Sequence, residues 1–302
     1  MPSPTLPQGK AVKKPDELAR SFEQLGYITD PALATSVYLA VSLGKPLLLE
    51  GHAGLGKTET AKTLAAFLGT RLIRLQCYEG LDVSSAVYEW NYQKQLLAIK
   101  IEERTGLSVE EKEKHIFSRE FLMERPLLQA IQEKETSPVL LIDEVDRADE
   151  AFEAFLLELL SDFQISIPEL GTIKAQHVPL VILTSNRSRE LGDALKRRCL
   201  YHWIEYPSAE KEMKIVAARL PGIGAALEKQ VVAFVQSVRT LNLMKAPGIA
   251  ETLDWAQALM ALGKTSLDNE AVEDTLGCLS KSMEDFAKIK AAGIEKMLAE
   301  VG

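Results

Sequence analysis

One loop of the sequence has the residue types and the spacing that bind nucleotide phosphates. It fits the pattern GxxxxGK(S/T) and lies between an apolar run at 47–49 and a helical pattern at 57–68. Glycines let the main chain wrap closely around phosphates, so that its N–H groups and the start of the following helix face negative charge. We predict that nucleotide is bound by Gly51, His52, Ala53, Gly54, Leu55, Gly56, Lys57, Thr58 and Glu59.

Two adjacent carboxylates form the second candidate site. Asp143 and Glu144 follow the apolar run Val139–Ile142, so a buried strand would deliver both at its carboxyl end, where ligands of open α/β sheets bind. In phosphoryl transfer the protein mainly supplies positioning and electrostatics. We therefore expect Lys57 to reach the β- and γ-phosphates of ATP. Thr58 and Asp143 would hold Mg²⁺, and Glu144 would orient and polarise the attacking water.

Short apolar runs alternate with helical patterns, which predicts an α/β protein with a parallel sheet covered by helices. We expect strands at 47–49, 72–76, 139–142, 180–184 and 200–205. The interval between Lys57 and Asp143 leaves room for an intervening strand, which is typical of P-loop proteins that use a glutamate base. The stretch 164–175 predicts a β-hairpin, because isoleucines flank a turn-like segment at 168–171.

Beyond Pro207 the strand patterns end. Helices are expected at 208–220, 227–241, 250–262 and 270–298. The chain is therefore predicted to have three parts: a disordered tail at 1–15, an α/β nucleotide-binding domain at 16–207 and a small all-helical lid domain at 208–302.

The composition is that of an ordinary globular protein, with 46% hydrophobic and 26% charged residues. The net charge of −8 argues against a general surface for nucleic acid or anionic membrane. No stretch approaches the roughly 18 apolar residues of a membrane span. The three cysteines are far apart and include no CxxC pair, so we expect reduced thiols. These observations predict a cytoplasmic protein without a membrane partner.

The order of the motifs resembles that of the AAA+ ATPases. The P-loop and the carboxylate pair are followed by Leu183-Thr184-Ser185-Asn186, then by Arg197-Arg198-Cys199, and then by the helical region. The resemblance implies a five-stranded P-loop fold. It implies that Asn186 is the sensor-1 residue, which helps hold the water that faces the γ-phosphate. Arg198 aligns with the arginine finger that enters the neighbouring subunit's site, with Arg197 as the alternative. Activity would then require ATP, Mg²⁺ and a ring of identical subunits, most often a hexamer.

Longer segments resemble the MoxR branch of this family, in particular the CoxD-type ATPases encoded beside molybdenum-containing carbon monoxide dehydrogenases. The stretches that carry this resemblance are 77–82, 79–92, 155–163, 164–175, 194–203 and 251–255. Such ATPases work with a protein that has a von Willebrand factor A domain, and they mature or activate a metalloenzyme. The resemblance thus implies an ATP-driven remodelling enzyme. One departure is Ile249, which occupies the place of the sensor-2 arginine of many MoxR proteins; the nearby Lys245 is the basic residue that would substitute for it.

Three other functions stay open from the sequence. Related MoxR-type ATPases are activases of a carboxylating enzyme, like rubisco activase, and the sequence separates this function poorly from metalloenzyme maturation. A nucleic-acid motor or loader is the second alternative, and the acidic net charge argues against it. The third is a nucleotide switch that does not hydrolyse ATP, and the presence of Glu144, Asn186 and Arg198 argues against it.

An aromatic cluster has two interpretations. Tyr88, Trp90 and Tyr92 alternate along the chain, so on a strand their side chains would share one face. Such side chains would pack in the core or at a subunit contact. Alternatively, they would grip a substrate or partner, because this insertion faces the central opening of the ring in relatives.

Overall fold

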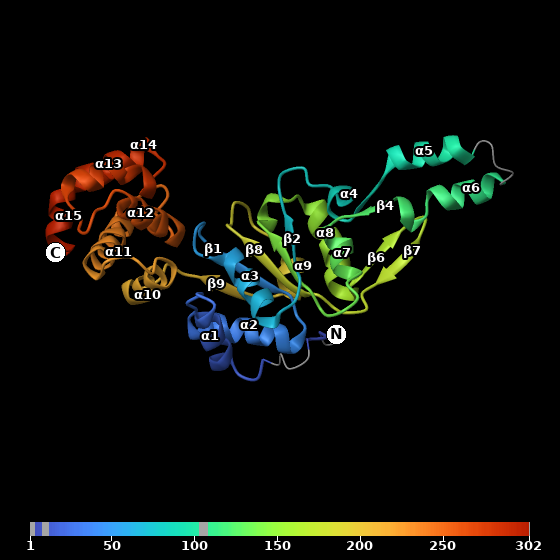
Figure 1. The fold of residues 1–302 in the computed structure, drawn as a ribbon, viewed down its shortest axis with the longest axis horizontal. Coiled ribbons are helices and arrows are strands. Elements are labelled where there is room, and N and C mark those ends of the chain that lie inside the picture. Colours follow the sequence, from blue (N-terminus) through green and yellow to red (C-terminus); the bar gives the residue numbers. More distant parts are fainter. Residues whose placement is uncertain (1–3, 8–11, 103–107, 302) are drawn as a thin grey trace. The chain divides into compact units, whose positions relative to one another are not determined.

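The computed structural model describes residues 4–7, 12–102 and 108–301 (Figure 1). Its central parallel sheet consists of β1 (Leu47–Gly51), β2 (Leu72–Gln76), β5 (Val139–Asp143), β8 (Leu180–Ser185) and β9 (Leu200–Ile204). Their order is β2-β5-β8-β1-β9, so β8, which follows Asp143 in the chain, lies between β1 and β5 in the sheet, and β2, the sheet strand between Lys57 and Asp143 in the sequence, lies at its edge. β1, β5 and β8 are buried along their whole length, as expected of inner parallel strands. The predicted fold class is confirmed.

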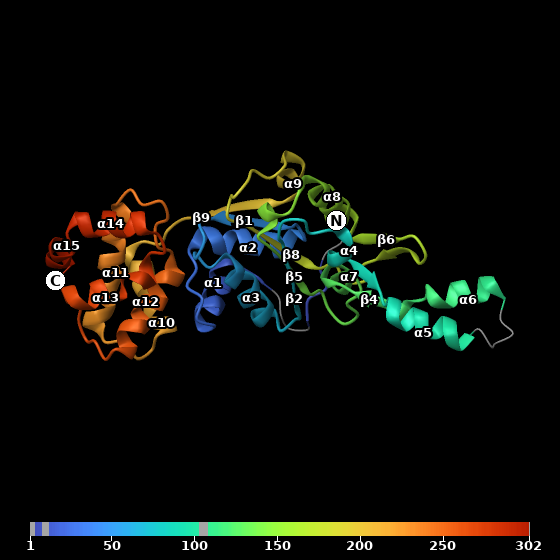
Figure 2. The same ribbon diagram turned by 90° about the horizontal axis from the view of Figure 1, so that it is seen from above.

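Helices flank this sheet (Figures 1 and 2). They are α2 (Pro31–Leu43), α3 (Lys57–Leu68), α7 (Pro126–Ile131), α8 (Glu150–Asp162) and α9 (Asp193–Arg198). Phe152, Leu156 and Leu159 lie along one face of α8 and are buried in the core. The Asp149 side chain accepts a hydrogen bond from the Phe152 N–H at 2.8 Å, which caps the helix at its start.

Two antiparallel additions are inserted between the elements of the sheet. The first is the predicted hairpin, formed by β6 (Gln164–Ile167) and β7 (Gly171–Lys174), with Ile165 opposite Ile173. The second pairs β3 with β4 and carries a pair of short helices. Its elements are α4 (Val83–Ala86), β3 (Tyr88–Trp90), α5 (Tyr92–Glu102), α6 (Val109–Ile116), the 3₁₀ turn η1 (Arg119–Phe121) and β4 (Leu122–Glu124).

Two of the three alternating aromatic residues, Tyr88 and Trp90, lie on β3 with ring centroids 6.0 Å apart, but Tyr92 lies outside this strand, which corrects the sequence-based expectation for Tyr92. The strand ends at Trp90, because the Asn91 side chain accepts a hydrogen bond from the Lys94 N–H (3.0 Å) and starts α5. Trp90 is buried, with its ring centroid 5.4 Å from that of Phe117. Tyr92, the first residue of α5, is 63% exposed. Core packing therefore accounts for Trp90.

The C-terminal region is helical, as predicted. Its helices are α10 (Ala209–Arg219), α11 (Ala225–Thr240), α12 (Ile249–Ala261), α13 (Asn269–Leu279), α14 (Met283–Ala292) and α15 (Ile294–Val301). The single helix predicted at 270–298 is wrong. Ser280 is extended, the Ser282 side chain caps α14, and Gly293 has a φ of 86°, so the main chain leaves the helical conformation twice.

The chain forms two compact units, and each unit is built from segments that are separated in the sequence. One contains Pro31–Glu50 and Ala61–His202. The other contains Ala19–Asp30, Gly51–Thr60 and the chain from Trp203 onwards, so the P-loop groups with the C-terminal helices. The core of these helices includes Phe234 and Trp255, whose ring centroids are 5.3 Å apart. The first helix, α1 (Pro15–Gln24), precedes α2.

The segment predicted as a disordered tail includes Thr5, which forms two hydrogen bonds with Ser137. The Thr5 N–H donates to the Ser137 hydroxyl at 2.8 Å, and the Ser137 N–H donates to the Thr5 carbonyl at 2.9 Å. Residues 1–3 and 8–11 of that segment lie outside the described residues. Within the part of the chain that the structure describes, no helix has the length and apolar character needed to cross a membrane.

Candidate nucleotide-binding site

The P-loop connects β1 to α3. Lys57 is buried, and its Nζ donates hydrogen bonds to the loop carbonyls of Gly51 (2.7 Å) and His52 (2.6 Å). Gly54 and Gly56 have φ angles of +78° and +84°, a conformation that residues with a Cβ rarely adopt. The glycines of the motif therefore allow the loop to curl back on itself around the ammonium group of Lys57.

The first turn of α3 is anchored by residues that the motif did not indicate. Glu59 forms an ion pair with Arg219, with 2.6 Å between Oε1 and Nη2. The hydroxyl groups of Tyr27 and Thr60 are 2.7 Å apart, and burial raises the pKa of Tyr27 to about 12, so its phenol stays protonated. Thr58, the predicted Mg²⁺ ligand, is half-buried in the same turn. These contacts fix the start of the helix that follows the loop.

The end of β5 presents the two predicted carboxylates in different environments. Asp143 is buried, and its Oδ1 accepts a hydrogen bond from the Thr184 hydroxyl. Glu144 has a left-handed main chain (φ 54°, ψ 49°), and its N–H donates to the Thr184 hydroxyl at 2.9 Å. A non-glycine residue in this conformation is uncommon and is held by its surroundings. Asp143 is thus fixed in the core, whereas the Glu144 side chain is partly exposed.

Asp146 links the ends of β5 and β8. It lies in the 3₁₀ turn η2 (Val145–Arg147) and is buried. Its carboxylate accepts hydrogen bonds from the N–H of Asn186 (3.2 Å) and of Ser188 (2.7 Å), and from the Ser188 hydroxyl (2.6 Å). Asn186 follows β8 directly and is half-buried. The predicted sensor-1 residue is therefore held beside the predicted carboxylate pair.

Replacing Asp146 with Asn is expected to lower the free energy of unfolding by about 2–3 kcal/mol, because the amide cannot accept all three hydrogen bonds of the carboxylate. Urea unfolding of both proteins measures this difference. Asp162→Asn is the matched control, since Asp162 is exposed at the end of α8. A loss for Asp146→Asn no larger than that of the control would mean that these bonds do not stabilise the fold.

Arg74 and Cys77 complete the surroundings of Asp143, and sequence reasoning missed the first of them. Arg74 binds the Asp143 Oδ2, with 3.0 Å from Nε, and it lies on the exposed face of β2. The only sequence feature that points to the position of Arg74 is the alternation of polar and apolar residues along this strand. The Cys77 N–H donates to the Asp143 carbonyl at 2.8 Å. Burial, and then the charges of Asp143 and Asp146, raise the pKa of the Cys77 thiol to about 12, so the thiol is neutral.

The two candidate arginines differ in their contacts. The Arg198 Nε donates to the Ser161 hydroxyl at 2.7 Å, and its Nη1 donates to the Ala194 carbonyl at 3.4 Å. Arg197 is exposed and makes no hydrogen bond or ion pair with any residue in the described ranges. Neither contact of Arg198 involves Asp143 or the P-loop. The structure thus does not bring either arginine to the carboxylates of its own chain.

Among the comparisons with known proteins, one family profile identifies the family of this chain. A search of curated proteins found no match. Among solved structures, a RuvB variant from Thermotoga maritima is 17% identical with a TM-score of 0.48, covering 90% of this chain and 72% of that chain. The RuvB Holliday junction branch migration motor of that organism is 17% identical with a TM-score of 0.45, covering 90% and 69%. The profile of the AAA domain (dynein-related subfamily) matches residues 46–199, slightly more than half of the chain. The chain therefore belongs to the AAA domain family, in its dynein-related subfamily, and is an ATP hydrolase.

Proposed function

We propose that this ATPase binds the phosphates of ATP with its P-loop and hydrolyses ATP with the groups at the ends of β5 and β8. The observation that carries this proposal is the parallel pairing of these two strands, which brings Asp143, Glu144 and Asn186 together. Glu144 is the accessible carboxylate of the pair, so it orients the attacking water and accepts its proton. Asn186 holds the same water from the neighbouring strand.

Thr58 and Asp143 are suited to hold the Mg²⁺ that the family implies. Hydroxyl and carboxylate oxygens are ligands that this ion prefers, together with the phosphates of the nucleotide. Thr184 and Arg74 already fix the orientation of the Asp143 carboxylate. When bound, Mg²⁺ neutralises charge on the β- and γ-phosphates. The ammonium group of Lys57 adds a second positive charge beside the loop.

The active form in this proposal is a ring of identical subunits, a hexamer as in most related ATPases. Arg198 then completes the site of the neighbouring subunit. It lies at the end of α9 and its hydrogen bonds go to Ser161 and Ala194 and not to Asp143 or Glu144, which supports a role in trans. Arg197 is the alternative.

Within this family we assign the chain to the MoxR branch and to the CoxD type. Hydrolysis would move its insertions against a metalloenzyme of the molybdenum hydroxylase or carbon monoxide dehydrogenase type. A protein with a von Willebrand factor A domain would be the second partner, and the work would take place in the cytoplasm. The charge and the motif order argue for this function over a nucleic-acid motor.

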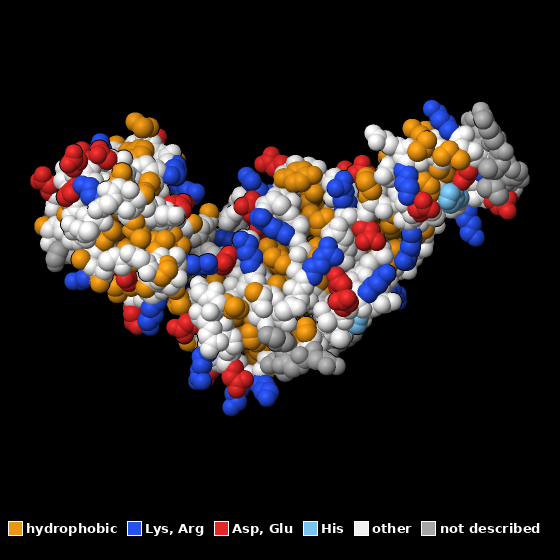
Figure 3. All heavy atoms as spheres, in the orientation of Figure 1, with side chains coloured by type: hydrophobic (Ala, Val, Ile, Leu, Met, Phe, Trp, Pro, Cys, Tyr) orange, Lys and Arg blue, Asp and Glu red, His pale blue; other side chains and the backbone are white. Residues whose placement is uncertain are grey.

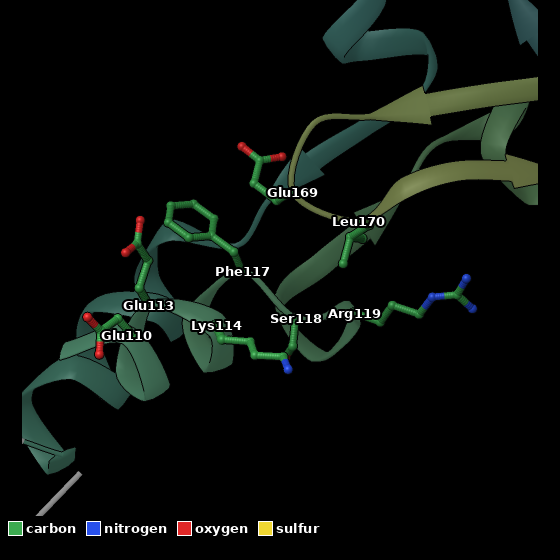
Figure 4. A pocket seen from close by; sticks show the side chains of 8 residues that line it. All are labelled: Glu110, Glu113, Lys114, Phe117, Ser118, Arg119, Glu169 and Leu170. Atoms are coloured by element: carbon green, nitrogen blue, oxygen red, sulfur yellow. The ribbon is translucent and has the colours of Figure 1, made fainter. Parts of the chain in front are cut away.

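The insertion that carries α5 and α6 supplies a surface for such a target. Leu96, Leu97 and Ile101 of α5 are 60%, 59% and 64% exposed, and apolar side chains gather over this helix in Figure 3. Exposed apolar surface of this kind marks protein contacts. Beside it, a cleft of about 470 Å³ separates α6 from the turn between β6 and β7. Glu113 and Phe117 line one side of the cleft, and Glu169 lines the other (Figure 4).

The function is tested by ATP-dependent activation of an apo carbon monoxide dehydrogenase in the presence of the von Willebrand partner. The double substitution Leu96→Ser, Leu97→Ser is expected to lower this activation at least about tenfold, because it removes the apolar contact. Basal ATP hydrolysis should stay within about twofold, since neither residue lies in the candidate site. Leu262→Ser is the matched control, with a leucine that is 60% exposed beyond the end of α12.

The alternatives give different results in the same assay series. Activation of an inhibited carboxylating enzyme instead would identify an activase. DNA binding that falls steeply with salt and stimulates ATP hydrolysis would identify a nucleic-acid motor. Activation that is unaffected by the double substitution would show that α5 does not contact the target.

A further inference from the structure

The start of α12 holds one peptide group of the P-loop. The Ala250 N–H, in the first turn of this helix, donates to the Gly54 carbonyl at 3.0 Å. In a trans peptide group the C=O and the N–H point in opposite directions. A Gly54 carbonyl that is fixed toward α12 therefore leaves the Leu55 N–H pointing away from α12. Main-chain N–H groups are the phosphate ligands of such a loop, so α12 orients one of them.

Gly248 permits this contact because it has no side chain. A Cβ at this position would lie 2.8 Å from the Ala53 carbonyl oxygen and 3.0 Å from the Gly54 carbonyl carbon. Both are main-chain atoms of the P-loop, so neither can rotate away. The φ of −83° and ψ of −173° at Gly248 are open to any residue. The need for glycine here thus comes from the close approach of the loop and not from the conformation of Gly248 itself.

Glu251 also contacts both the start of α12 and the P-loop. Its Oε2 accepts a hydrogen bond from the Gly248 N–H at 2.9 Å. The same oxygen lies 2.7 Å from the place that a Cβ on Gly54 would take. The start of α12 and the P-loop therefore pack closely at two glycines: a Cβ at Gly248 would meet the main chain of the P-loop, and a Cβ at Gly54 would meet the end of the Glu251 side chain.

A buried ion pair anchors the chain just before Gly248. The Arg239 guanidinium binds both carboxylate oxygens of Glu212 at 2.6 Å, and both side chains are almost fully buried. Its Nε donates to the Pro247 carbonyl at 2.8 Å. The Thr252 hydroxyl of α12 donates to Glu212 at 2.7 Å. Because Arg239 is the group that neutralises the buried Glu212 charge, this anchor has little freedom to shift.

We propose that Gly248 is a positioning residue for ATP binding: because it has no side chain, the start of α12 comes close enough to the P-loop to fix the peptide group that contains the Gly54 carbonyl and the Leu55 N–H. This effect runs through the main-chain hydrogen bond from Ala250 to Gly54. Arg239 is a second positioning residue, which acts through Pro247. The inference rests on the proposed phosphate-binding role of the P-loop.

Gly248→Ala in the full chain is expected to raise the Kd for a fluorescent ATP analogue about tenfold, which corresponds to about 1.4 kcal/mol. The matched control is Gly277→Ala in α13, where a Cβ would meet open space; its Kd should stay within about twofold of the wild type. Hydrogen exchange of the Ala250 amide gives a second readout. ATP should slow this exchange at least about fivefold in the wild type, and should have no such effect in Gly248→Ala.

A wild-type Kd for Gly248→Ala would overturn the inference. If that variant does not fold, Arg239→Lys replaces it, because lysine keeps the buried positive charge but lacks the fork that binds both Glu212 and Pro247. Its Kd is expected to rise about fivefold, and an unchanged Kd would likewise overturn the inference. Lys57→Ala gives the reference for lost phosphate binding. A wild-type chain that binds ATP no better than Lys57→Ala would contradict the proposed site itself.

Discussion

Glu144→Gln is expected to lower the turnover number for ATP by a factor on the order of 10² to 10⁴, with ATP affinity unchanged. Glutamine keeps the size and shape of glutamate but cannot accept the proton of the attacking water. The left-handed turn and the hydrogen bond from the Glu144 N–H to Thr184 involve only the main chain of residue 144, so the substitution leaves the geometry in place. Steady-state ATP hydrolysis measures the turnover, and equilibrium binding of labelled ATP measures the affinity.

Glu150→Gln is the control for this experiment, because Glu150 is an exposed glutamate in the first turn of the nearby helix α8. Its turnover should stay within about twofold of the wild type. Retained turnover in Glu144→Gln would assign the proton transfer to another group. A large loss of ATP affinity would instead show that Glu144 contributes to binding and not to the chemical step.

The elements that carry the site could be predicted because their patterns are local. α3 begins and ends at the predicted residues, and β2 also has its predicted bounds. The long helix predicted at 270–298 failed for a local reason as well. Apolar periodicity continues across Ser280 and Gly293, and only the capping by Ser282 and the left-handed glycine reveal the two breaks.

The residues that support the site could not be predicted, because their partners are far apart in the sequence. Asp143 and Glu144 stand out as a pair at the end of an apolar run. Arg74, however, is 69 residues from Asp143, and Arg219 is 160 residues from Glu59. In the sequence, neither arginine can be distinguished from the other polar residues, because its partner becomes a neighbour only in the folded chain. The same holds for Gly248, whose importance depends on the approach of the P-loop.

Arg198→Ala is expected to lower the turnover number by a factor on the order of 10³ to 10⁵, while ATP binding and assembly are retained. In the native chain, Ser161 and Ala194 hold Nε and Nη1 of Arg198, and Nη2 has no hydrogen-bond partner in the described parts of the chain. The guanidinium is therefore held in a fixed orientation, and its Nη2 can donate a hydrogen bond to the phosphate of ATP in the neighbouring subunit. Arg197→Ala, the control, should change turnover by no more than a few-fold. The reverse ranking of the two variants would assign the finger to Arg197.

A mixture of two inactive variants decides whether the arginine acts in trans. Arg198→Ala subunits keep Glu144, and Glu144→Gln subunits keep Arg198. In an equal, random ring about a quarter of the interfaces combine an intact Glu144 with an intact Arg198 from the next subunit. Turnover should therefore recover on mixing, and turnover per wild-type subunit should rise with protein concentration as rings assemble. A mixture as inactive as its components, with concentration-independent wild-type turnover, would mean that each subunit completes its own site.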